Sequence, residues 1–210
     1  MKKLLMTAAL GLFALQSPAL AGDPILVSSK TGAFNYYKPT TNDHLSDIEK
    51  QAYDILMRER AKRGLPSIPL SSSLTLVAGR HVEDFTRNIA PRGGPIPGTN
   101  THSWSDAPYY ANHGAPKAMW DAPKRLRTRY RKNGYEITAW GYSDPEVVIK
   151  GFLNSPNHRK VILNEGMWQR KTWRSVGIGF GRAKVQGQYR TFWSIWFGDA
   201  KDPAGKPQRN

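Results

Sequence analysis

The sequence contains no cysteine, and this absence excludes several ways of stabilising or anchoring a protein. Without cysteine the fold cannot depend on disulfide bonds, even in an oxidising compartment. The protein also cannot be a lipoprotein attached through an N-terminal cysteine, nor can it use a thiol as a nucleophile. Its stability must therefore come from side-chain packing and from the pairing of strands.

Long apolar runs are absent too, apart from one at the N-terminus. Lys2 and Lys3 precede an apolar run from Leu4 to Leu15, and Ala19-Leu20-Ala21 has the small-x-small pattern that signal peptidase cleaves. A retained membrane anchor is the alternative, but the run is short for a hydrocarbon layer of about 30 Å. We therefore predict a signal peptide over residues 1–21, an exported protein that is periplasmic or secreted, and a mature chain without a transmembrane segment.

Acidic residues are scarce: 16 Asp and Glu stand against 31 Lys and Arg, a formal net charge of +15. A charge of this size attracts polyanions, although solubility alone is an alternative reason for it. An exported protein meets anionic lipid, lipopolysaccharide and cell-wall polymer before it meets nucleic acid. These envelope components are therefore the expected partners, and no physiological nucleic-acid partner is expected.

The next part of the chain contains residues that begin and end helices. Residues 22–45 are polar, contain prolines, show no helical period and are predicted to form an N-terminal arm. Ser46-Asp47-Ile48-Glu49 is a capping box that begins a helix ending near Gly64. A second helix is predicted from Ser73 to Asn88. Asp144-Pro145-Glu146 has the pattern of an N-cap and first turn, and this third helix should stop before Pro156.

The end of the chain has the pattern of strands. Val176, Ile178 and Phe180 alternate with glycines, and an aromatic strand from Tyr189 to Phe197 follows a turn at residues 184–187. Glycine at every second position lets another element, here a helix, pack closely on that face. Helices followed by a terminal meander predict a sheet covered by helices. Residues 201–210 are predicted to be a loose basic tail.

Two histidines and one glutamate are candidates for chemistry. His102 lies in a long loop region, His158 follows the third helix, and Glu136 lies between them. Two imidazoles and a carboxylate are the ligand set of a catalytic-type zinc site with an open position. No HExxH spacing ties them together, however, and scattered histidines often form only hydrogen bonds. No G-x-S-x-G nucleophile elbow is present.

Several motifs occur in an order that resembles the CAP superfamily (cysteine-rich secretory, antigen 5, pathogenesis-related 1-like), also called the SCP domain. Glu136 to Gly141 is similar to the E-N-I-A-x-G segment of its bacterial members, and Phe152 to Leu163 is similar to W-x-x-S-P-x-H-R-x-x-I-L. Further likenesses are Ala78 to Phe85 with A-x-x-H-x-x-D-M, His102-Ser103 with H-S/T, Val176 to Gly179 with V-G-I-G, and Phe192 to Gly198 with the closing aromatic strand.

The resemblance implies an α/β fold of the α-β-α sandwich type, with a central, largely antiparallel sheet between helical layers, over residues 46–200. It implies a cleft lined by the set His81, His102, Glu136, Ser155 and His158. In some members the two histidines that match His102 and His158 bind a divalent metal, often zinc. The second cleft acid of many eukaryotic members falls at Ser155 here, so the full tetrad is incomplete.

Binding of lipid, an anionic envelope component or a divalent metal through this central His/Glu cleft is the function that the sequence favours. Members of the family are associated with lipids, metal ions and glycans, and a basic segment here could hold an anionic ligand. Its candidate residues are Lys124, Arg125, Arg127, Arg129, Arg131 and Lys132. One alternative is a metal-assisted hydrolase of peptide or cell-wall material, with Glu136 as general base. Another is a structural envelope or matrix protein without a small ligand.

Overall fold

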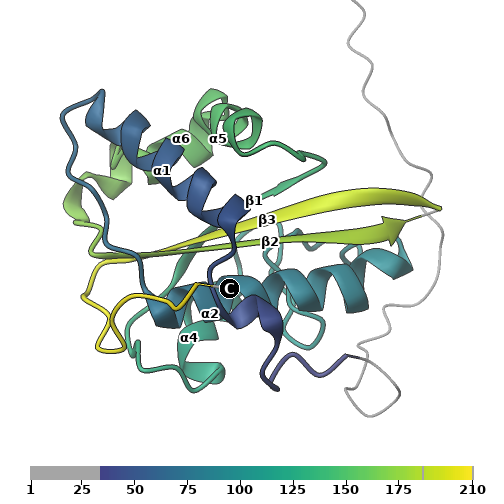
Figure 1. Cartoon of the computed structure of the whole chain (residues 1–210). Coiled ribbons are helices and arrows are strands. Elements are labelled where there is room, and N and C mark those ends of the chain that lie inside the picture. Colours follow the sequence, from purple (N-terminus) through teal and green to yellow (C-terminus); the bar gives the residue numbers. More distant parts are fainter. Residues whose placement is uncertain (1–33, 186, 210) are drawn as a thin grey trace, which may run out of the picture.

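The computed structural model describes residues 34–185 and 187–209 (Figure 1). The predicted signal peptide and the start of the N-terminal arm lie outside these residues. The longer helices are α1 (Asp47–Ala61), α2 (Ser72–Asp84), α5 (Pro145–Asn154) and α6 (Pro156–Ile162), and the strands are β1 (Tyr135–Trp140), β2 (Ser175–Val185) and β3 (Gln188–Gly198). The short helical segments are η1 (Thr41–Asp43), η2 (Phe85–Ile89), η3 (Ala90–Arg92), α3 (Lys117–Trp120), α4 (Ala122–Arg125) and η4 (Gly166–Arg170).

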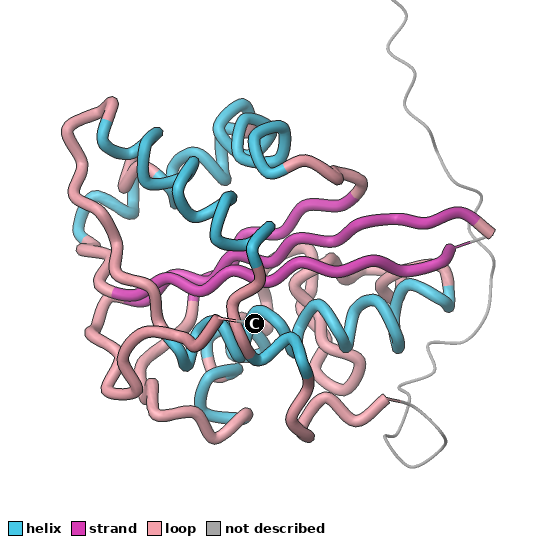
Figure 2. The backbone as a smooth tube through the Cα atoms, viewed as in Figure 1, coloured by secondary structure: helices cyan, strands magenta, loops and turns pink. Residues whose placement is uncertain are grey.

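The three strands form one antiparallel sheet with the order β1-β3-β2, which passes between two helical layers (Figures 1 and 2). The predicted fold class, α/β with an antiparallel sheet between helical layers, is therefore confirmed. The β2–β3 hairpin is longer than β1, because β1 pairs only with Phe192–Phe197. The predicted meander is also confirmed, since Val185 pairs with Gln188 across the turn.

One face of the sheet is aliphatic and aromatic, and α1, α5 and α6 cover it (Figure 1). Ile137, Ile195 and Ile178 lie side by side across the three strands. They share a buried cluster with residues such as Leu56 of α1 and Phe152 of α5. Alternation along each strand sends these side chains to one face and leaves a different set for the other.

The opposite face carries the polar groups, and α2 lies very close to it. Gly177, Gly179 and Gly181 of β2 point toward α2, as the sequence predicts. A Cβ atom built on Gly179 would lie 2.5 Å from the backbone carbonyl of Ala78, and one on Gly177 would lie 2.1 Å from the carbonyl carbon of Leu74. The missing side chains are therefore what allows the backbone of α2 to approach the sheet.

The predicted helix 73–88 is regular only as far as Asp84. A π-helical turn, η2, follows over Phe85–Ile89, and η3 continues from it. At this place Thr86 donates its hydroxyl to the carbonyl of Val82 over 2.7 Å, a contact that bends helices. The first and third predicted helices are confirmed, with the capping box at Ser46 and the end of α5 before Pro156.

The prediction of a loose C-terminal tail is wrong. Asp202 accepts hydrogen bonds from the backbone N–H of Ser73 and from the hydroxyls of Ser71 and Ser73, at 2.7 to 2.8 Å. The N–H of Leu45 donates to the carbonyl of Gln208 over 2.9 Å. A carboxylate near a helix N-terminus satisfies backbone N–H groups and meets the positive end of the helix dipole. This segment is therefore part of the folded domain.

Among the residues that the structure describes, no helix is both long enough and apolar enough to cross a membrane.

The close approach of α2 leads to a prediction about stability. Gly179→Ala should lower the free energy of unfolding by about 3 kcal/mol or more, because the added methyl group meets backbone atoms of Ala78 that cannot rotate away. The matched control is Gly151→Ala in α5, where the nearest atoms belong to the side chain of Tyr142. This control should change stability by no more than about 1 kcal/mol, since alanine also favours the helix. Urea unfolding of the three proteins gives the comparison, and equal losses would contradict it.

Candidate functional site

A cluster of hydrogen bonds centred on Glu136 lies between α2 and the sheet. The Oε1 atom of Glu136 is 2.5 Å from Nδ1 of His81 and accepts a hydrogen bond of 2.5 Å from the hydroxyl of Ser194. Its Oε2 atom is 2.9 Å from Nδ1 of His102. Glu136 is on β1, His81 on α2, Ser194 on β3, and His102 in the loop after η3. Four distant parts of the chain therefore meet at one carboxylate.

The hydrogen-bond partners fix where the protons lie. Nε2 of His81 is 3.0 Å from the carbonyl oxygen of Ser103, which can only accept, so Nε2 carries a proton. The other nitrogen of His81 faces the carboxylate of Glu136, which accepts when it is ionised. When Glu136 is ionised, each ring nitrogen of His81 faces an acceptor, which is the arrangement of an imidazolium ion paired with a carboxylate. The indole N–H of Trp196 donates to Ser194 over 2.8 Å, so the hydroxyl proton of Ser194 is directed at Glu136.

Burial and charge act against each other at this pair. The side chains of His81 and Glu136 are both 0% exposed. Burial disfavours the charge on His81, but the attraction of Glu136 and their hydrogen bond outweigh it and raise the pKa of His81. Burial likewise opposes ionisation of Glu136, but the charge of His81 and the hydrogen bonds from His102 and His81 lower its pKa to about 2. The pair is charged because each partner stabilises the other.

Two groups that the sequence did not mark as site residues support His81. The ring of Trp104 stacks on the imidazole with ring centres 4.5 Å apart. Asp84, one turn along α2, accepts from the N–H of Ser105 at 2.7 Å and from its hydroxyl at 2.5 Å. Asp84 therefore holds the loop that supplies the carbonyl of Ser103. The motif in α2 contains Asp84, but nothing in the sequence shows which loop it binds.

The other two predicted cleft residues lie at the junction of α5 and α6. Ser155 is the residue between these helices, and its N–H donates to the carbonyls of Gly151 and Phe152. His158 is half-buried in α6, with its ring against the edge of Phe152. Burial and the nearby charge of His102 lower the pKa of His158. Within the described residues, His158 makes no hydrogen bond to His102 or Glu136.

A metal bound by His102, His158 and Glu136 does not fit this arrangement. Both oxygens of Glu136 already accept hydrogen bonds, and the carboxylate is enclosed. Among the described residues, no group of three or more His, Cys, Asp or Glu side chains is placed to hold a metal ion. A catalytic zinc site needs three protein ligands. The carboxylate of Glu136 is therefore a hydrogen-bond acceptor and not a metal ligand here, and metal binding by His102 and His158 alone stays a prediction.

The basic segment divides into paired and exposed cations. Lys124 forms an ion pair with Asp121 at 2.7 Å, and the guanidinium of Arg125 lies 4.9 Å from the ring centre of Trp104. Arg127, Arg129 and the following pair Arg131-Lys132 are exposed. The segment thus contributes both to the core and to the surface.

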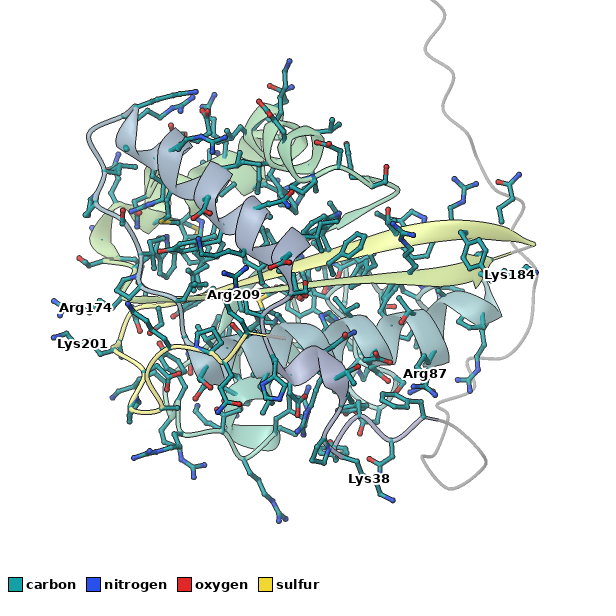
Figure 3. The ribbon with its side chains drawn as sticks, in the orientation of Figure 1. Lys38, Arg87, Arg174, Lys184, Lys201 and Arg209 are labelled. Carbon is teal, nitrogen blue, oxygen red and sulfur yellow. The ribbon has the colours of Figure 1, made fainter. Side chains whose placement is uncertain are left out.

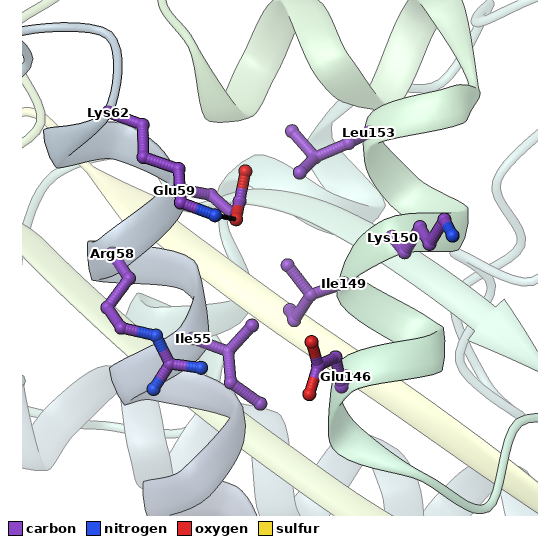
Figure 4. Close-up of a pocket in the computed structure, with 8 residues that line it drawn as sticks. All are labelled: Ile55, Arg58, Glu59, Lys62, Glu146, Ile149, Lys150 and Leu153. Atoms are coloured by element: carbon purple, nitrogen blue, oxygen red, sulfur yellow. Dashed lines mark hydrogen bonds and ion pairs between the residues drawn. The ribbon is translucent and has the colours of Figure 1, made fainter.

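Two hollows are present away from Glu136. One, of about 240 Å³, lies between α1 and α5, with Ile55, Ile149 and Leu153 as its apolar members and an ion pair between Lys62 and Glu59 at its rim (Figure 4). The other, of about 300 Å³, is lined by Tyr37, Arg125, Leu126 and Arg127. Neither is lined by the predicted cleft residues.

Comparison with known proteins gives distant likenesses. No family model matches the chain. The uncharacterized protein YkwD of Bacillus subtilis is 26% identical over 137 residues, which are 65% of this chain and 43% of YkwD. Solved structures with a similar fold include a cysteine-rich secretory protein of Staphylococcus aureus (15% identity, TM-score 0.46) and an SCP-domain extracellular protein of Bacillus anthracis (20%, 0.45). This chain is similar to CAP-domain proteins.

The extent of these likenesses is limited. The two structures each cover 73% of this chain, and this chain spans 38% and 40% of their lengths. The chain also spans less than half of YkwD. An outer surface protein of Borrelia burgdorferi is matched over 77% of this chain and 96% of its own, with 16% identity and a TM-score of 0.44. The likeness to CAP-domain proteins is one of fold, and the activities of whole relatives do not follow from it.

The ion pair between His81 and Glu136 predicts a pH-dependent contribution to stability. The lowered pKa of Glu136 stabilises the fold above its ordinary value of 4.5, and this contribution is lost as the pH falls toward 2. The raised pKa of His81 stabilises the fold below its ordinary value of 6.5, and this is lost as the pH rises through the raised pKa. Glu136→Gln should therefore cost most between pH 4.5 and 6.5, about 3–5 kcal/mol.

The control for this experiment is Ser194→Ala, which removes a hydrogen bond to the same carboxylate without removing a charge. Its cost, about 1–3 kcal/mol, should vary little with pH. Thermal unfolding of the wild type and both variants across the pH range gives the result. A cost of Glu136→Gln that does not depend on pH would show that the pair is not charged.

Proposed function

We propose that this chain is an exported CAP-domain protein that acts by binding anionic lipid, and that the basic segment from Lys117 to Lys132 is its binding surface. The observation that carries the proposal is the set of exposed cations in this segment. They are Lys117, Arg127, Arg129, Arg131 and Lys132. Within the described residues, none of the five forms an ion pair. Cations that have no internal partner are free to meet phosphate groups.

One aromatic side chain in the same segment suits a lipid interface. Trp120 is 37% exposed and follows Lys117 by one turn in α3. Indole rings favour the boundary between water and acyl chains. Leu126 and Tyr130, which alternate with the cations in the sequence, point into the core and do not face an interface. Their role is to fix the segment against Trp196, so that the intervening arginines face outward.

Export is supported by the N-terminal pattern of Lys2, Lys3, Leu4–Leu15 and Ala19-Leu20-Ala21. The names of three similar proteins, a secretory protein, an extracellular protein and an outer surface protein, agree with it. Anionic lipid is then a partner within reach of the protein. The exported location and the positive charge are thus parts of one proposal.

The hydrolase alternative has less support. A general base must reach the proton that it removes, and the carboxylate of Glu136 is enclosed and already bonded through both oxygens. Its pKa of about 2 also makes it a weak base. The geometry therefore favours a structural role for Glu136, with binding elsewhere on the molecule.

Vesicle sedimentation tests the binding surface. The full protein should sediment with phosphatidylglycerol vesicles but not with phosphatidylcholine vesicles. Changing Arg127, Arg129, Arg131 and Lys132 together to Gln should weaken binding at least about tenfold, because each cation near an anionic surface contributes about 1 kcal/mol. Binding should also weaken when ionic strength rises from about 0.1 M to about 1 M, since the screening length falls from about 10 Å to about 3 Å.

The matched control removes four exposed cations from the opposite helical layer and its edge: Arg58, Lys150, Lys160 and Arg170. Other exposed cations are widely spread, with Lys184 at the hairpin end and Arg174 and Lys201 at the other end of the sheet (Figure 3). If both quadruple variants lose binding equally, net charge alone is responsible and the proposed surface is wrong. Binding to a cell-wall polymer but not to vesicles would also contradict the proposal.

A further inference from the structure

The hollow beside the basic segment has two arginines among its lining residues. It has a volume of about 300 Å³, and two of its four lining residues are Arg125 and Arg127. Arg127 is exposed, whereas Arg125 is half-buried. Two arginines that line one cavity attract negative charge, because the cavity walls exclude part of the solvent.

Arg125 also carries half of the buried side-chain nitrogen and oxygen atoms that have no hydrogen-bond partner in the described part of the chain. Its Nη1 atom donates to the carbonyl of Ala118 over 3.1 Å, but its Nε and Nη2 atoms are buried and have no partner. Among the described residues, only two other buried side-chain atoms share this condition, Nε1 of Trp104 and Oγ1 of Thr75. Since Arg125 lies against the ring of Trp104, three of the four unmet atoms are gathered at one place.

Leaving the Nε and Nη2 donors of Arg125 unpaired lowers the stability of the fold unless an acceptor binds to them. A buried donor without a partner costs about 1–3 kcal/mol, and more when the group is charged. Nε and Nη2 lie on the same edge of a guanidinium group, and this edge matches two oxygens of a phosphate or carboxylate. The unmet edge of Arg125 is therefore chemically complementary to an oxyanion.

The protein does not supply that oxyanion itself. Asp106 is the carboxylate beside the tyrosines at this site, and both of its oxygens accept phenol hydroxyls. Tyr36 donates to one and Tyr37 donates to the other over 3.1 Å. Within the described residues, Arg125 forms no ion pair with Asp106 or with any other acid. An acceptor for the Nε and Nη2 edge of Arg125 is therefore water or a ligand and not an acidic side chain of the described residues.

We propose that the cavity lined by Arg125 and Arg127 is a binding site for one phosphate group. The free edge of Arg125 holds two phosphate oxygens, and Arg127 neutralises the remaining charge. Because Nε and Nη2 are enclosed without a ligand, binding requires the side chain of Arg125 to turn this edge toward the cavity that it lines. This inference rests on the proposed function, since a lipid headgroup is one source of the phosphate; free phosphate is the other.

The test titrates inorganic phosphate into the full-length protein without vesicles. The Nε–H NMR signal of Arg125, identified by its loss in Arg125→Lys, should shift and saturate at one phosphate per chain. Arg125→Lys keeps the charge but lacks the two-donor edge, so its phosphate affinity, measured by calorimetry, should fall at least about tenfold. Arg170→Lys is the control, since Arg170 is an exposed arginine outside the cavity lining, and its affinity should equal that of the wild type.

The outcomes separate cleanly. Equal affinity in Arg125→Lys, or an Arg125 signal that does not saturate, overturns the inference even if vesicle binding is confirmed. Phosphate binding at Arg125 without vesicle binding removes the proposed function and leaves the phosphate site. A parallel titration with glycerol phosphate identifies the source: tighter binding than inorganic phosphate indicates a headgroup, and weaker binding indicates free phosphate.

Discussion

The contact between His81 and Glu136 is the interaction on which the polar half of the molecule depends. It forms only because α2 lies against the glycines of β2, which brings His81 within 2.5 Å of a carboxylate on β1. Two buried charges are stable together and costly apart, so the pair fixes how α2, the sheet and the loop around Ser103 fit together. The candidate cleft is thus an internal brace of the fold, and ligand binding is expected on the surface beside it.

The sequence predicts the layered fold from local signals that act over short distances. The capping box at Ser46, the Asp144-Pro145 helix start and the glycine alternation each specify their own element, and all three are confirmed. The missed strand β1 does carry a signal, because Tyr135, Ile137 and Ala139 alternate with Glu136 and Thr138, and glycines flank the segment. The docking of the tail depends on Asp202 reaching the start of α2, a contact that spacing along the chain cannot indicate.

The sequence predicts which residues form the candidate site, but it does not predict what each residue does there. The family resemblance names His81, His102 and Glu136, and the structure brings these three together. It cannot show that Glu136 is enclosed, because enclosure is produced by Ser194, Trp196 and Trp104 from other segments. For the same reason the unmet donors of Arg125 are invisible in a sequence that shows only a run of cations. The net positive charge of the sequence indicates an anionic partner, whereas the buried, unpaired donors of Arg125 indicate where that partner binds.

The central claim is that His81 is an imidazolium held by Glu136, which makes the cluster a structural brace. Its most direct test is a long-range proton–nitrogen NMR spectrum of the histidine rings near neutral pH. The account predicts that both nitrogens of His81 carry protons in the wild type and that one proton is lost in Glu136→Gln. A His81 ring with a single protonated nitrogen in the wild type would contradict it, and would return Glu136 to the list of candidate bases.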